Sequence, residues 1–77
     1  MNINPQEQLK GKQLYTLINQ MDEDGSVNGV TAGLDPVNNE EDYTNLIRIL
    51  TKLTDKYGEM EELIEEDNEI YFIFTNF

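Results

Sequence analysis

The residues in this chain whose types could do chemistry are carboxylates, and they are unevenly spread. The sequence holds 16 Asp and Glu residues against five Lys and Arg residues and no His, which gives a net charge of −11 over 77 residues. Residues 22–42 contain seven acidic residues and no basic one, and residues 59–77 contain another seven with no basic one. The rest of the chain is close to neutral, so the acid is concentrated in two blocks.

The sequence contains few residues that could support catalysis. Paired carboxylates can act as general acids and bases, but these acids stand in runs that are typical of solvated faces. Ser26 is the only serine, and the chain has neither a Cys nor a His that could act as a nucleophile or activate one. The glycines are scattered and no Gly-Lys-Ser/Thr phosphate loop follows them. We therefore predict a protein that is not an enzyme and uses no cofactor.

One acidic segment has the beginning of a metal-binding pattern. With Gly25 at the sixth position of a calcium-binding EF-hand loop, Asp22 and Asp24 fall on ligand positions three and five. Position one is then Gln20 and position twelve is Thr31, so the charged first ligand and the bidentate Glu are missing. We expect an acidic turn here and no metal site.

Charge density is the property that the acid blocks offer for recognition. If residues 59–69 were helical, their seven carboxylates would span roughly 16 Å at about 1.5 Å per residue. That is about one charge per 2.4 Å, compared with about one per 3.4 Å of a single DNA strand. A rigid face of this kind can present charge at the density of DNA to a basic groove. The simpler interpretation is a solvated surface that keeps a small protein in solution.

In size, acidity, absence of Cys and His and mixed helix–strand pattern, the chain resembles the small DNA-mimic inhibitors of bacteriophages and mobile elements. The resemblance extends over the whole chain and is one of composition, without a shared motif. It implies a non-enzymatic inhibitor that occupies the DNA-binding surface of a basic host protein, such as the nucleoid protein HU or a repair, restriction, CRISPR or transcription protein. The acids that would replace phosphates are Asp22, Glu23, Asp24, Glu40, Glu41, Asp42, Glu59, Glu61, Glu62, Glu65, Glu66 and Asp67.

An alternative function is a small interaction or regulatory module in which the acids serve only solubility. Its working surface would be apolar, formed by Ile49, Tyr71, Ile73 and Phe77 or by the edge of the C-terminal strand.

Both functions need elements that position these residues, and a chain of this length predicts a single α+β domain over residues 1–77. Asn4 as a cap and Pro5 at the first helical position predict a helix over residues 5–21. Gly and Pro punctuate residues 22–38, where we expect turns and a short strand over Val27–Thr31. The apolar positions with helical spacing in the first helix are Leu14, Leu17, Ile18 and Met21.

The second half of the chain has the stronger signals. A helix is expected to begin near Asn39 and end at Gly58, with its acidic residues in the first turn. A short third helix is predicted over residues 59–66, and a turn at Asp67–Asn68 leads to a strand over residues 69–75 that is apolar on both faces. The stripe of the second helix is formed by Tyr43, Leu46, Ile47, Leu50, Leu53, Thr54 and Tyr57.

The C-terminal strand needs a partner, and these elements offer only residues 27–31 or the same strand of a second copy. A bare apolar edge would aggregate, so we expect a small sheet that is completed in a homodimer. No apolar run reaches the roughly 18 residues of a membrane helix, and residues 1–4 do not begin as a signal peptide does. A cytoplasmic location is therefore expected. The negative charge argues against direct binding of nucleic acid or of an anionic membrane.

Overall fold

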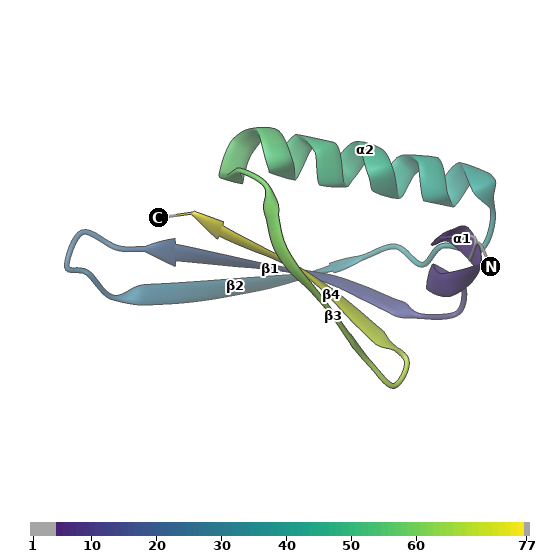
Figure 1. Ribbon diagram of the computed structural model, residues 1–77, viewed down its shortest axis with the longest axis horizontal. Coiled ribbons are helices and arrows are strands. Elements are labelled where there is room, and N and C mark those ends of the chain that lie inside the picture. Colours follow the sequence, from purple (N-terminus) through teal and green to yellow (C-terminus); the bar gives the residue numbers. More distant parts are fainter. Residues whose placement is uncertain (1–4, 77) are drawn as a thin grey trace.

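The computed structural model describes residues 5–76 and shows an α+β fold in which a long helix covers one face of a four-stranded sheet (Figure 1). The strand order is β2-β1-β4-β3, with the two central strands parallel and each edge strand antiparallel to its neighbour. The fold is therefore two hairpins joined by the long helix. The elements are α1 (Pro5–Leu9), β1 (Gln13–Met21), β2 (Val27–Leu34), α2 (Glu40–Tyr57), β3 (Met60–Glu66) and β4 (Glu69–Asn76).

The predicted helix over residues 5–21 is wrong beyond Leu9. Gly11 adopts a φ of 78°, which ends the short helix α1, and the chain continues as β1 from Gln13. Leu14, Thr16 and Ile18 are buried in alternation with half-buried residues, so the period that governs this segment is two and not 3.6. The expected cap at Asn4 lies outside the described residues.

The predicted third helix over residues 59–66 is also wrong, because this segment forms the edge strand β3. Met60, Leu63 and Ile64 have helical spacing, but pairing with β4 overrides this local preference. Leu63 lies opposite Phe72 and Ile64 opposite Tyr71, so they point to different faces of the sheet. The predicted turn at Asp67–Asn68 is confirmed, and it joins β3 to β4 with Asp67 at a φ of 48°.

The helix α2 agrees with its prediction at both ends. Asn39 caps it by accepting a hydrogen bond from the backbone N–H of Asp42 at 2.8 Å, and the N–H of Gly58 returns to the carbonyl of Thr54 at 2.9 Å. Within residues 5–76, neither helix is long and apolar enough to cross a membrane. The stripe residues that pack on the core are Tyr43, Leu46, Leu50, Leu53 and Tyr57, whereas Ile47 is exposed.

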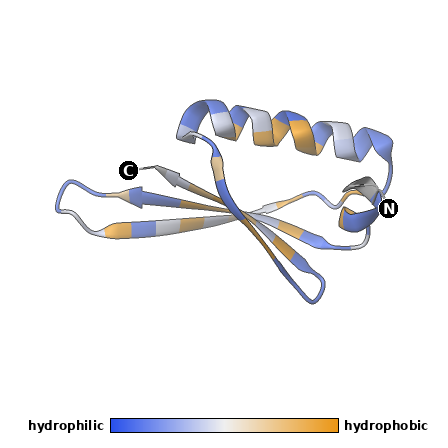
Figure 2. Ribbon diagram, viewed as in Figure 1, coloured by the Kyte–Doolittle hydropathy of each residue, from blue (hydrophilic) through white to orange (hydrophobic). Residues whose placement is uncertain are grey.

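The core lies between α2 and the central strands. β1 and β4 are paired in register, and Ile70, Phe72 and Phe74 of β4 point toward the helix together with Leu14 and Ile18 of β1. Hydrophobic residues lie along the strands and in the middle of α2, whereas the hairpin turns and the ends of α2 are mostly hydrophilic (Figure 2). The predicted strands at 27–31 and 69–75 are both confirmed, and the first extends to Leu34.

The C-terminal strand is central and is paired on one side with β1 and on the other with β3, the two segments predicted to be helical. It has no bare edge, so its pairing does not require the predicted homodimer. The edges of the sheet are β2 and β3 instead.

Candidate functional site

The face of the sheet opposite α2, which we call the open face, is centred on two aromatic rings. Tyr15 of β1 and Tyr71 of β4 are register partners, and their rings stack with centroids 5.0 Å apart and planes 18° apart. Leu17 and Ile73 form the next pair on this face, and Ile73 is buried. The open face therefore has an ordered apolar centre without a covering helix (Figure 1).

Four carboxylates lie on the β3 side of this open face. Glu62 pairs with Ile73, and Glu66 pairs with Glu69, so the alternation of the strands places all three acids on the same face as Tyr71. Glu61 lies at a register shift between Met60 and Glu62, and its carboxylate accepts a hydrogen bond from the hydroxyl of Thr75. We call this group the acidic patch; its members are Glu61, Glu62, Glu66 and Glu69.

The five basic residues lie elsewhere. Arg48, Lys52 and Lys56 are on α2, which covers the other face of the sheet, and Lys10 and Lys12 are at the connection from α1 to β1. Within the described part of the chain, no member of the acidic patch forms a salt bridge with any of them.

Glu65 is the acidic residue of β3 that forms a salt bridge. It is opposite Ile70 and so lies on the helix side of the sheet, where its carboxylate is 3.3 Å from the ammonium of Lys12 and accepts a hydrogen bond from Gln8 at 3.4 Å. The same ammonium donates to the carbonyl of Asp67 at 2.9 Å. Gln8 thus links α1 to β3, and Lys12 links the connection after α1 to the β3–β4 hairpin, a structural role of Glu65 that the sequence did not indicate.

The acids at residues 22–24 form the tip of the β1–β2 hairpin. Asp24 accepts hydrogen bonds from the hydroxyl of Ser26 at 2.6 Å and from its N–H at 2.9 Å, and these two bonds lower the pKa of the Asp24 carboxyl. Asp22 accepts from the hydroxyl of Ser26 at 3.3 Å and from the side chain of Asn28. Gly25 has a φ of 86°, as the last residue of this three-residue hairpin loop requires. Among residues 5–76, no three acidic side chains form a group that could hold a metal ion.

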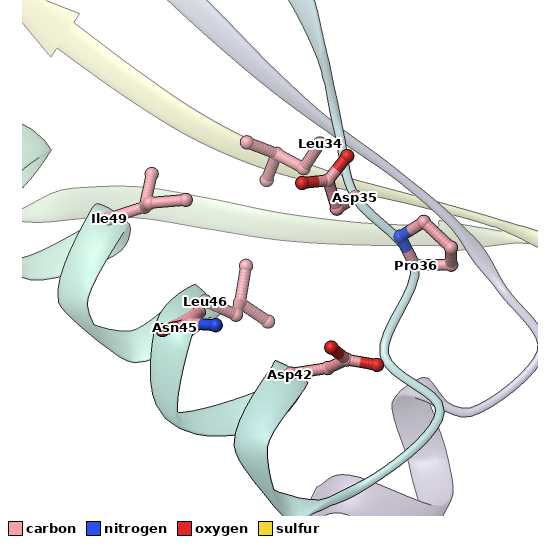
Figure 3. A pocket seen from close by; sticks show the side chains of 7 residues that line it. All are labelled: Leu34, Asp35, Pro36, Asp42, Asn45, Leu46 and Ile49. Carbon is pink, nitrogen blue, oxygen red and sulfur yellow. The ribbon is translucent and has the colours of Figure 1, made fainter.

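The acids at residues 40–42 serve the start of α2. Asp42 accepts a hydrogen bond from the N–H of Asn38 at 3.1 Å, which completes a capping arrangement with Asn39, and Glu40 and Glu41 stand at the positive end of the helix. Asp42 also lines a pocket of about 50 Å³ together with Asp35, where both carboxylates lie between α2 and the end of β2 (Figure 3).

The structure therefore divides the predicted contact residues. The hairpin tip at residues 22–24 and the start of α2 lie at opposite ends of a molecule that is 44 Å long (Figure 1). Glu59 precedes β3, and Asp67 lies in the β3–β4 turn. Of the predicted set, only Glu61, Glu62 and Glu66 share the open face, and Glu69 joins them although it was not among the predicted contacts.

A second surface is apolar and lies on the helix side. A groove of about 170 Å³ runs between α2, β3 and β4, and its rim includes Ile47 and Leu63, which are 43% and 42% exposed. The residues proposed for the apolar alternative do not form one surface, because Ile49 is on α2 whereas Ile73 is buried on the open face. Phe77 lies outside the described residues.

The fold and the site together define an acidic α+β protein with a four-stranded mixed sheet, one covered face and one open face. Comparisons of the chain with models of protein families, with curated proteins and with solved structures gave no match.

The open face has a measurable signature in Tyr71. Its hydroxyl donates to the carboxylate of Glu69 at 2.7 Å, and this hydrogen bond, with the negative charge nearby, raises the pKa of Tyr71 above its ordinary value of 10.0. Because the folded pKa is raised, this contribution to stability is present below the pKa of the unfolded tyrosine and is lost as the pH rises through the folded pKa.

We expect Glu69→Gln to lower the pKa of Tyr71, because the neutral amide accepts a weaker hydrogen bond and no longer repels a tyrosinate. A titration followed by tyrosinate absorbance measures this shift, and Tyr71→Phe identifies the step that belongs to this residue. An unchanged titration of Tyr71 in Glu69→Gln would show that the two side chains do not meet.

Proposed function

We propose that this protein is a non-enzymatic DNA mimic that inhibits a basic DNA-binding protein by occupying its DNA-binding surface. The observation that carries the proposal is the acidic patch, four carboxylates on the open face that form no salt bridge in the described part of the chain. A partner with a groove for phosphates offers the cations that the patch lacks. In this proposal the protein acts in the cytoplasm of a bacterial host.

The spacing of the acids supports this assignment, although less strongly than a helix would. The four acids of β3, from Glu61 to Glu66, span about 16 Å at about 3.3 Å per residue, or about one charge per 4 Å. A single DNA strand carries about one charge per 3.4 Å. One of these four, Glu65, is paired with Lys12, and Glu69 on the neighbouring strand adds a charge to the face.

Repulsion inside the acidic patch points in the same direction. Glu66 and Glu69 are direct partners in the β3–β4 hairpin, and like charges in this position destabilise a sheet. Neither carboxylate of this pair forms a salt bridge in the described part of the chain. A basic partner would relieve this repulsion. The free energy of binding would then include the repulsion energy that destabilises the free protein.

The aromatic pair beside the patch supplies the apolar part of such a contact. Tyr15 and Tyr71 are stacked and lie next to the carboxylates on the same face. Tyrosine is enriched among the residues that dominate binding energy, and an apolar centre with a charged rim is the ordinary anatomy of a protein interface.

The test is capture of partners from a bacterial lysate on immobilised protein, with elution by salt in one portion and by duplex DNA in another. We expect a basic DNA-binding protein to leave the parent column under both conditions. A matched column carries the variant with Glu61, Glu62, Glu66 and Glu69 replaced by Gln, and it should not retain that protein. Partners that resist both salt and DNA would contradict the mimic function.

A second candidate function rests on the apolar groove between α2 and β3. The exposed side chains of Ile47 and Leu63 at its rim suit a partner held by apolar contacts, which keep their strength as salt rises. A partner of this kind would be retained by the variant with a neutral open face and lost by Leu63→Asp.

A further inference from the structure

The two edges of the sheet differ sharply in charge. The edge strand β3 carries four glutamates, which is a common protection against unwanted pairing. The opposite edge strand, β2, consists of eight residues without a single charge, and nearly all of it is exposed. Val30 on this strand is 56% exposed. Within residues 5–76, β1 is the only sheet partner of β2.

The alternation of hydrogen-bonded pairs along the β1–β2 hairpin identifies which backbone groups of β2 point away from β1. The N–H of Asp22 donates to the carbonyl of Ser26 at 2.8 Å, so these residues form a hydrogen-bonded pair at the end of the ladder. Such pairs alternate along an antiparallel ladder, and the next ones are therefore at Asn28, Val30 and Ala32. The N–H and C=O groups that point away from β1 are those of Val27, Gly29, Thr31 and Gly33.

Both ends of this neutral edge are acidic. The hairpin tip with Asp22, Glu23 and Asp24 precedes β2, and Asp35 follows its last residue. The uncharged length between these ends is about 26 Å for eight residues at about 3.3 Å each. An occupant that extends along the whole edge therefore meets negative charge at each end.

A second copy of this chain suits that edge poorly. Antiparallel pairing of two β2 strands would bring the acidic tip of each copy to the Asp35 end of the other, and parallel pairing would place the two tips side by side. Like charges would meet in either arrangement, between molecules that each carry a net charge of −11. An extended segment with basic ends has the complementary charge.

We propose that the β2 edge binds an extended segment of another protein by strand addition, and that this segment has an uncharged centre of about six residues with Lys or Arg at both ends. Main-chain hydrogen bonds to Val27, Gly29, Thr31 and Gly33 would supply the affinity, and the acidic ends would select the basic flanks. This site is separate from the acidic patch, because β2 and β3 are opposite edges of the sheet.

The experiment uses a capped synthetic peptide of six alternating threonines and valines with two lysines at each end. Amide hydrogen exchange of the full chain is followed by NMR with and without it. At a peptide concentration of about ten times its dissociation constant, exchange at the four outward residues should slow about tenfold. Exchange at Asn28, Val30 and Ala32, which already donate to β1, should change little. A uniform change over all of β2, or none at the four outward residues, would overturn the proposal.

Two controls test the role of the acidic ends and the role of the outward backbone groups separately. A peptide with the same centre and two glutamates at each end should give no slowing, and equal slowing would disprove selection by the acidic ends. Thr31→Pro removes one outward N–H without breaking the ladder to β1 and should abolish protection, whereas Thr31→Val should keep it.

Slowing that appears with protein concentration alone would identify a second copy as the occupant and overturn the proposal. The variant with a neutral acidic patch should bind the peptide like the parent chain, so failure of one proposal leaves the other intact.

Discussion

Replacing Phe74 with alanine is expected to remove a large part of the free energy of unfolding of the protein. Phe74 lies in the central strand β4, its side chain is fully buried, and it packs with Ile18 in the layer beneath α2. Loss of a buried phenylalanine costs about 3–5 kcal/mol. A chain of 77 residues has only about 4–12 kcal/mol of stability at about 0.05–0.15 kcal/mol per residue, so this single change removes a large part of it.

Urea denaturation followed by circular dichroism measures this loss, and two variants control it. Phe74→Leu keeps most of the volume and should cost less than about 1.5 kcal/mol. Val30→Ala removes apolar atoms from an exposed position on β2 and should change the free energy of unfolding by less than about 0.5 kcal/mol. If Phe74→Ala were as stable as Val30→Ala, β4 would not lie at the centre of the core.

The sequence predicted those elements whose signals are local and agree with one another. α2 has an Asn cap, acids in its first turn, an apolar stripe with a 3.6-residue period and a glycine at its end. The strand β4 is a run of β-branched and aromatic residues bounded by a turn. In both cases the preference of the segment and its place in the fold point the same way, so the prediction needed no knowledge of the neighbours.

The two segments that were wrongly predicted to be helical have apolar residues whose spacing fits both a helix and a strand. Leu14 and Ile18 are four residues apart, which fits a helix face, and they are equally even positions of a strand with Thr16 between them. In residues 60–66 the Glu, Met and Leu residues favour a helix, whereas the open side of β4 offers a strand partner. Both segments become strands because β4 lies between them and pairs with each. The local sequence of either segment does not contain this information.

The candidate site depends on the same non-local information. The two acid blocks could be located from composition alone, but the face on which each acid lies is set by strand register. Glu65 and Glu66 are neighbours in the sequence, yet one is paired with Lys12 on the helix side and the other faces Glu69 on the open side. Tyr15 could not be assigned to the site while its segment was expected to be helical.

The second large effect concerns the acidic patch. Replacing Glu61, Glu62, Glu66 and Glu69 together with Gln should weaken binding to the captured DNA-binding protein by about a hundredfold at low salt. Exposed charge pairs contribute about 0.2–1 kcal/mol each, so four of them give about 1–4 kcal/mol. A hundredfold change in affinity corresponds to about 2.8 kcal/mol, which lies within this range. The binding constant should also depend less on salt concentration, since fewer charges meet in the complex.

A matched variant separates the acidic patch from net charge. Glu23, Glu40, Glu41 and Asp55 lie at the hairpin tip and on α2, outside the acidic patch, and their replacement by Gln or Asn changes the net charge by the same four units. We expect this variant to bind within about threefold of the parent, because exposed charges outside the contact act only through screened, long-range fields. Equal losses in the two variants would mean that the partner responds to total charge and not to a face.

Replacing Glu66 alone with Gln tests stability independently, because Glu69 and Glu61 keep their hydrogen bonds to Tyr71 and Thr75. This substitution removes the repulsion between Glu66 and Glu69, so the free energy of unfolding should rise by a few tenths of a kcal/mol, in the range of about 0.2–1 kcal/mol for a cross-strand pair. Binding and stability are thus expected to move in opposite directions. A surface whose acids serve only solubility predicts the gain in stability without the loss of binding, whereas misfolding of the variant predicts losses in both. Measured on one protein preparation by denaturation and by titration with the partner, this opposition distinguishes a recognition surface from a solvated one.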